Sequence, residues 1–176
     1  MKDEAEFNRI VANSLKASKT TINDKEVAGW GYKISDAAGA YLMATIKSPF
    51  DGFGILAKDG QVYNVYFESK FNKSLSAINL NRIEPHQMES LLATSVTPSS
   101  KSLFCLGLNG EKRGDNRAYI FDVSAVSELY YEGFSIHKKF LEQLPYNEIH
   151  KGIFSFDYII TKEELYKNIG KKDSTL

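Results

Sequence analysis

The chain has 176 residues, 43% of them hydrophobic and 12% aromatic, and its 22 basic residues balance its 22 acidic ones. This length suits a single domain over residues 1–176, and the composition is that of a folded protein rather than a disordered one. The zero net charge argues against a non-specific nucleic-acid coat protein, which would need a large basic excess. It does not exclude a DNA enzyme whose lysines gather on one face.

The single cysteine, Cys105, lies in the apolar run SLFCLGL and excludes an internal disulfide. Burial in such surroundings disfavours the thiolate, so we expect a structural thiol. No apolar stretch approaches the roughly 20 residues that span a bilayer, and the segment MKDEAEFNRI lacks the apolar region of a signal peptide. We therefore expect a cytoplasmic protein that does not enter a membrane.

Apolar periodicity and turn residues predict alternating helices and strands. This order predicts an α/β fold in which helices flank a central mixed sheet. In chain order we expect a helix over residues 3–18, a strand over 41–46, a hairpin over 48–70, a helix over 84–94, a buried strand over 102–108, a strand over 117–126, an amphipathic helix over 135–144, a strand over 152–160 and a short helix over 161–169.

The hairpin SPFDGFGILAKDGQVYNVYFESK carries three charges at its open end. If its central Asp-Gly pair forms a two-residue type I′ turn, the resulting register puts Asp51 directly opposite Glu68. Lys70 then points to the same side, because side chains alternate along a strand. A three-residue loop with a bulge would shift this register by one residue.

Two opposed carboxylates destabilise a hairpin unless a positive charge lies between them. A divalent cation such as Mg²⁺ accepts two carboxylates plus waters, and a lysine beside it would orient or help deprotonate an attacking water. Gly52 and Gly54 beside Asp51 mark a place where a ligand or another backbone approaches closely. The alternative is that the charges are the solvated ends of an ordinary hairpin.

The spacing from P-F-D to E-S-K resembles the PD-(D/E)xK nuclease motif, with Pro49, Asp51, Glu68 and Lys70 in the motif positions. The stretch that follows resembles RecU-type Holliday-junction resolvases, in which an F-E-A-K strand leads through a polar loop and an Asn-containing segment to an H-Q pair that opens a helix. The resemblance covers about residues 45–92. Its further elements in this chain are Asn79 or Asn81 and the pair His86-Gln87.

The resemblance implies a restriction-endonuclease-like core of order αβββαβ and a homodimeric, Mg²⁺-dependent endonuclease that cuts branched DNA, with Mn²⁺ able to substitute. It implies that Asp51 and Glu68 bind the metal together with the backbone carbonyl of Ser69. It further implies that Lys70 assists the attacking water and that Gln87 faces the site from its helix.

The first helix departs from this pattern. Many relatives carry a glutamate there, at the position that Asn8 occupies in this chain. An Asn side chain still accepts a hydrogen bond but supplies less charge. Glu4 and Glu6 are nearby alternatives, although a solvated first turn is the plainer interpretation. We also find no segment that matches the stalk which RecU-type enzymes push into a junction, so the nuclease hypothesis is stronger than the junction hypothesis.

The basic residues nearest the hairpin are candidates for phosphate contacts. Two alternatives to a resolvase remain open. One is a restriction- or repair-type nuclease that acts on duplex or flap DNA, and the other is a non-catalytic DNA-binding or protein-interaction module that retains the nuclease scaffold. The candidate DNA contacts are Lys47, Lys73, Arg82 and His86, with Lys16 and Lys19 on the first helix.

Overall fold

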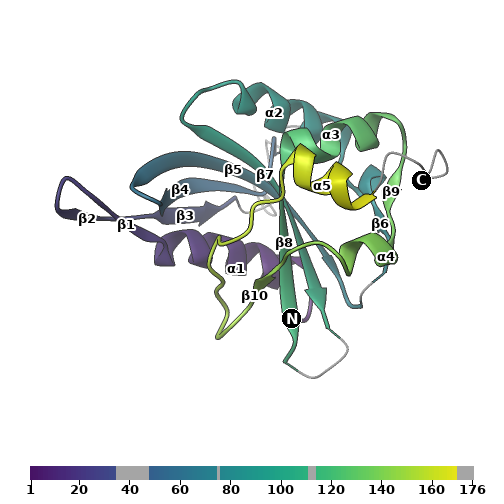
Figure 1. Ribbon diagram of the computed structural model, residues 1–176, viewed down its shortest axis with the longest axis horizontal. Helices are drawn as coiled ribbons and strands as arrows, with labels where there is room; N and C mark the ends of the chain where they lie inside the picture. Colours follow the sequence, from purple (N-terminus) through teal and green to yellow (C-terminus); the bar gives the residue numbers. More distant parts are fainter. Residues whose placement is uncertain (35–47, 75, 111–113, 170–176) are drawn as a thin grey trace, which may run out of the picture.

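A six-stranded mixed sheet forms the centre of the molecule. The computed structural model describes residues 1–34, 48–74, 76–110 and 114–169. The strand order is β10-β8-β7-β5-β4-β3, and β5 and β7 run parallel while the other neighbours run antiparallel (Figure 1). The strands are β3 (Trp30–Lys33), β4 (Gly52–Lys58), β5 (Gln61–Asn72), β7 (Ser100–Asn109), β8 (Asn116–Asp122) and β10 (Asn147–Glu148).

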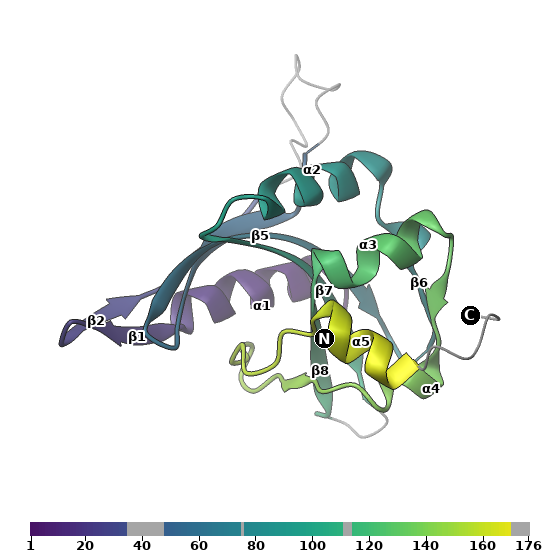
Figure 2. The same cartoon turned by 45° about the horizontal axis from the view of Figure 1, so that its top comes forward.

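Helices flank the sheet on both faces, as the sequence predicts (Figure 2). One face is covered by α1 (Glu4–Ala17), whose predicted apolar stripe is buried against β4 and β5. The opposite face buries a second apolar cluster under four helices. These helices are α2 (Pro85–Ser95), α3 (Val123–Tyr131), the short α4 (Lys138–Leu141) and α5 (Lys162–Ile169).

The glycines of β3 and β4 allow close packing within the protein itself. A Cβ at Gly31 would collide with the backbone of Ala12 in α1, and one at Gly54 would collide with the Trp30 carbonyl. A Cβ at Gly52 would enter the ring of Phe67. Of the two explanations for these glycines, the structure therefore supports close backbone and ring packing.

Several expected elements differ from the structure. The strand expected over 117–126 ends at Asp122, whose carboxylate accepts from the Ser124 N–H at 2.9 Å and caps α3, a helix that the sequence analysis did not predict. The helix expected over 135–144 is reduced to α4, since residues 135–136 form a strand and Pro145 follows closely. The strand expected over 41–46 lies outside the described residues.

The segment 152–160 is also not a strand, although its side chains alternate. The side chain of Asn147 accepts from the Tyr158 N–H at 3.0 Å and donates to the Tyr158 carbonyl at 2.9 Å. These bonds satisfy backbone groups that a neighbouring strand would otherwise satisfy. Its strand-like pairings among the described residues are isolated bridges, such as Phe121 with Ile160.

The remaining elements lie at the edges. The strands β1 (Lys19–Ile22) and β2 (Lys25–Ala28) form a separate hairpin, and β6 (Ile78–Asn79) pairs with β9 (Ser135–Ile136) ahead of the turn η1 (Leu80–Arg82). Cys105 is fully buried in β7, and this burial raises the pKa of its thiol. Within the described ranges, no helix combines the length and apolar character needed to cross a membrane.

Candidate active site

The register of the β4–β5 hairpin confirms the predicted two-residue turn. The two turn residues have positive φ values of 51° and 74°, as a type I′ turn requires. The pairing continues without a bulge to Gly52 opposite Phe67. Continued by one residue beyond the paired strands, this register would bring Asp51 opposite Glu68, and the Asp51 carboxylate does lie beside the next residue, Ser69.

Asp51 is held in place by the residue that follows Glu68. The backbone N–H of Ser69 donates to Asp51 Oδ2 at 2.9 Å, and the Ser69 hydroxyl donates to the same oxygen at 2.8 Å. Burial raises the pKa of Asp51, although the two Ser69 bonds and the charge of Lys70 act in the opposite direction. The carboxylate is therefore oriented by β5 before any ligand arrives.

Glu68 and Lys70 form a buried ion pair. Lys70 Nζ lies 2.6 Å from Glu68 Oε1, and Glu68 is 0% exposed. Its second oxygen, Oε2, is buried without a hydrogen-bond partner among the described residues. Burial, followed by the charge of Asp51, raises the pKa of Glu68 to about 7. Burial lowers the pKa of Lys70, but the charge and hydrogen bond of Glu68 outweigh this effect, so the pKa is raised overall.

The first turn of α1 contributes an acid to this group. Glu4 Oε1 lies 3.4 Å from Lys70 Nζ, and Glu4 Oε2 lies 3.0 Å from Arg82 Nη2. The backbone N–H of Phe71 also donates to Glu4 Oε2 at 3.3 Å. The expectation that the first turn is merely solvated is therefore wrong for Glu4.

The two other first-helix candidates differ from each other. Asn8 is buried, and its Oδ1 has no hydrogen-bond partner among the described residues. It lies one turn after Glu4, on the same side of the helix. Glu6 instead accepts a hydrogen bond from the Lys2 N–H at 2.7 Å. Its carboxylate therefore binds the backbone at the start of the helix and does not join the group around Lys70.

Gln87 does not take the site-facing role that the resemblance implies. Its Oε1 accepts from the Glu84 N–H at 2.9 Å and completes a capping box at the start of α2. The neighbouring His86 contacts the Ser48 carbonyl through Nε2 at 3.0 Å, and its Nδ1 lies 3.5 Å from a Glu84 carboxylate oxygen. His86 thus ties α2 to the segment that leads into Asp51.

The expected DNA contacts are dispersed. Lys73 is exposed just beyond the end of β5. Arg82 is engaged with Glu4, with the Asn72 side chain and with the Phe71 carbonyl at 3.3 Å. Lys16 is exposed and Lys19 pairs with Glu26, while Lys47 lies outside the described residues.

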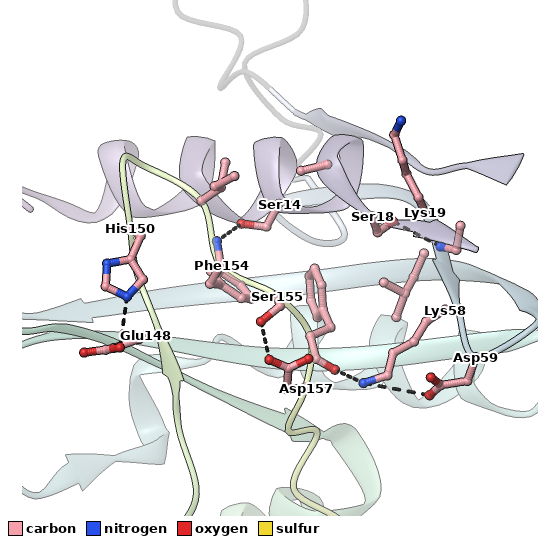
Figure 3. Close-up of a pocket in the computed structure, with 15 residues that line it drawn as sticks. Ser14, Ser18, Lys19, Lys58, Asp59, Glu148, His150, Phe154, Ser155 and Asp157 are labelled. Atoms are coloured by element: carbon pink, nitrogen blue, oxygen red, sulfur yellow. Dashed lines mark hydrogen bonds and ion pairs between the residues drawn. The ribbon is translucent and has the colours of Figure 1, made fainter. Parts of the chain in front are cut away.

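A hollow of about 610 Å³ lies elsewhere, between the end of α1, the turn of the hairpin and the segment 148–157 (Figure 3). Several of its polar side chains are paired with each other or with backbone. His150 lies 2.9 Å from Glu148, and Lys58 donates to the Phe156 carbonyl. The His150 and Glu148 side chains are 74% and 60% exposed, so this pair is solvated, unlike the pair at the open end of the hairpin.

The open end of the hairpin brings two carboxylates of like charge close together. Among the described residues, no group of three or more His, Cys, Asp or Glu side chains is placed to hold a metal ion. Asp51 and Glu68 nevertheless repel each other, and Glu68 Oε2 is buried without a partner there. Two carboxylates are ligands that Mg²⁺ accepts while it keeps several waters of its own, and the resemblance adds the Ser69 carbonyl to them.

In comparisons with known proteins, the chain matches no protein-family model and no curated protein.

Proposed function

We propose that the protein is a Mg²⁺-dependent, structure-specific DNA endonuclease, of the RecU type of Holliday-junction resolvase, that hydrolyses phosphodiester bonds in branched DNA. The observation that carries the proposal is the buried Glu68–Lys70 pair, on which the charge of Asp51 acts. A buried carboxylate with an unpartnered oxygen and a pKa of about 7 costs stability. Such perturbed groups concentrate at functional sites.

The arrangement of the elements supports the same proposal. If the separate β1–β2 hairpin, the two-residue strand β6 and the turn η1 are left aside, the chain runs through α1, β3, β4, β5, α2 and β7. This reduced order agrees with the αβββαβ order that the resemblance to PD-(D/E)xK nucleases implies. The motif residues lie where β4 begins and where β5 nears its end, beside the first turn of α1.

In the proposed reaction, the residues at the open end of the hairpin would have three different roles. Asp51, Glu68 and the Ser69 carbonyl would hold the ion, which supplies positive charge against the negative charge that develops on the phosphate. Ser69 keeps Asp51 oriented. Lys70 keeps a proton at Nζ, because three carboxylates raise its pKa against the effect of burial, and it would donate that N–H to the attacking water.

A panel of substrates tests the proposal. Synthetic four-way junctions, flaps and blunt duplexes are incubated with the protein in Mg²⁺, and we expect the junction to be cut most efficiently. Preferential cleavage of the duplex or flap would instead favour a restriction- or repair-type nuclease. If the wild type cuts none of these substrates, or if Asp51→Asn and Lys70→Ala both retain full activity, the nuclease proposal fails.

A non-catalytic module that retains the scaffold is the second candidate. It is favoured by Asn8 in the position where relatives carry an acid, and by Lys70, which already neutralises Glu68. Calorimetry with Mg²⁺ and Mn²⁺ separates the two functions. If the wild type releases no heat of ion binding, and its titration curve is the same as that of Asp51→Asn, the result would favour the module.

The proposal includes a C2 homodimer. Symmetric cleavage of a four-way junction requires two active sites, and a two-fold axis would relate them. Light scattering of the protein with and without junction DNA measures the assembly. If the protein is a monomer both with and without DNA, the homodimer and its symmetric cleavage are refuted, and the proposal is reduced to a nuclease with a single active site.

A further inference from the structure

A row of aromatic side chains occupies the β3 edge of the sheet. Trp30 and Tyr32 are 43% and 56% exposed, whereas Gly31 between them is buried and faces α1. Phe53 of β4 lies directly opposite Tyr32, and its ring centroid is 5.6 Å from that of Trp30. By strand alternation, these three rings lie on the sheet face opposite α1.

The row continues to the candidate active site. Phe53 also pairs with Tyr66 of β5, and Tyr66 lies two residues before Glu68 on the same strand face. The ring of Phe50, next to Asp51, packs on Tyr66 with a centroid distance of 5.2 Å. We call this set the aromatic face: Trp30, Tyr32, Phe50, Phe53 and Tyr66.

The rings are tilted against one another, and Trp30 and Tyr32 are the exposed members of the set. The three ring pairs are tilted, with interplanar angles of 83° for Trp30–Phe53, 50° for Tyr32–Phe53 and 60° for Phe50–Tyr66. None of these pairs is stacked face to face. The helices of this side, α2 and α3, pack on β5, β7 and β8. Exposed ring surfaces of this kind stack on nucleobases whatever their sequence.

We propose that the aromatic face binds unpaired nucleobases of the DNA strand whose phosphate enters the candidate active site. This inference rests on the proposed function and specifies its substrate class as DNA with unpaired bases beside the cut, such as a flap or an opened junction. In an intact duplex the bases are stacked on one another and do not reach a protein ring without being flipped out. Continuity with Glu68 on one sheet face favours this occupant over a second copy of the chain.

Trp30 is the only tryptophan in the chain, so tryptophan emission reports on this surface directly. Wild-type protein in a chelator is titrated with a single-stranded oligonucleotide, and we expect saturable quenching of the emission. An abasic oligomer of the same length and a blunt duplex of the same sequence are the matched ligands. Both should bind at least about tenfold more weakly, because neither offers free bases to stack.

Two tyrosine variants complete the test. Tyr32→Ala should weaken single-strand binding by about tenfold, while Tyr32→Phe should retain it. Tyr158→Ala is the control, since Tyr158 is 51% exposed in the segment 152–160, and it should bind like the wild type. Thermal unfolding of each variant shows that the fold is intact. Because Tyr32 lies on an exposed edge strand, we expect unfolding temperatures close to that of the wild type.

Three results would overturn the inference: equal quenching by the abasic or duplex ligand, unchanged binding in Tyr32→Ala, or emission that depends on protein concentration and not on DNA. The last would mean that a second copy covers the aromatic face. The cleavage panel is scored separately. Cleavage of branched DNA without quenching would refute the aromatic face alone, whereas base-dependent quenching without cleavage of any substrate would refute the nuclease and leave a base-binding surface.

Discussion

The two ends of the β4–β5 hairpin carry the same kinds of residue in opposite surroundings. At the turn, Lys58 lies 3.9 Å from Asp59, whose side chain is 80% exposed, beside the hollow of Figure 3. At the open end, Lys70 lies 2.6 Å from the fully buried Glu68. Water screens the first pair, while the second pair has lost most of its hydration.

This difference shows that a hollow and a cluster of buried charges need not coincide. The hollow is lined by pairs that solvent already stabilises, such as His150 with Glu148. The open end holds carboxylates whose pKa values are raised, by burial in Asp51 and by burial and the charge of Asp51 in Glu68. Buried, repelling charges are the better guide to a site that exists to bind something.

The largest expected effect is a loss of DNA cleavage when the aspartate at the open end is replaced, compared with the same replacement at the turn. Asp51→Asn should lower DNA cleavage by about 10²–10³-fold, since it removes charge at the place where the ion would be held. Asp59→Asn is the matched control, because Asn-Gly suits a type I′ turn as well as Asp-Gly does. Cleavage rates at saturating Mg²⁺ measure both. Equal losses in the two variants would mean that the two ends do not differ in function.

Replacing the lysine at each end of the hairpin should change the free energy of unfolding by different amounts. Lys70→Ala should lower the free energy of unfolding by about 3–5 kcal/mol near pH 8, because Glu68 would be left buried without its partner. Lys58→Ala should cost only about 1 kcal/mol, the value of one hydrogen bond. Urea denaturation measures both changes. A Lys70→Ala cost as small as that of Lys58→Ala would indicate that water enters the open end freely.

The pH dependence should also distinguish the open end. The pKa of Glu68 is raised from 4.5 to about 7, so the folded protein holds a proton that the unfolded chain releases. Stability from this group is therefore fully present below about pH 4.5 and is lost as the pH rises through about 7. A cation at Glu68 must displace the same proton, so Mn²⁺ affinity should rise by up to about tenfold per pH unit below 7 and then level off.

Calorimetric titration with Mn²⁺ at several pH values measures this rise, and thermal unfolding without metal measures the opposite trend in stability. Glu68→Gln is the control that should abolish both. Metal affinity that is flat across this range would contradict a role for Glu68 as the titrating ligand.

The smallest expected effect concerns Gln87. Gln87→Ala should cost about 1 kcal/mol through loss of the capping box, and Gln87→Glu should restore most of it. Urea denaturation is again the measurement. Loss of cleavage as deep as that of Asp51→Asn, with no change in the denaturation midpoint, would return Gln87 to the site.

The hairpin and its register were predictable because their signals are local. A two-residue Asp-Gly turn fixes which residues face each other, and alternation fixes where Lys70 points. The place of Glu4 was not predictable from such signals, since it depends on where α1 lies over the sheet. The spacing of Glu4 and Asn8 by one helical turn was the available clue, and only the packing shows that this side meets Lys70.

Other differences have equally physical causes. The segment E-P-H-Q contains a capping-box spacing with proline at the first helical position, which accounts for the contact that the Gln87 side chain makes. The alternation over 152–160 predicts a strand, but the Asn147 side chain satisfies its backbone instead. The aromatic row escaped prediction because its edge strand, β3, is only four residues long.

The parallel pairing of β5 with β7 has a consequence for the order of folding. The hairpin is a local structure that can form early, but Glu68 is covered only when Phe104 of β7 arrives beside it from a distant part of the chain. Before that step, the carboxylates and Lys70 are hydrated like any surface charges. The burial of Glu68 and Lys70 is thus acquired late, so a variant that slows the docking of β7 would delay the raised pKa of Glu68 without changing Asp51, Glu68 or Lys70.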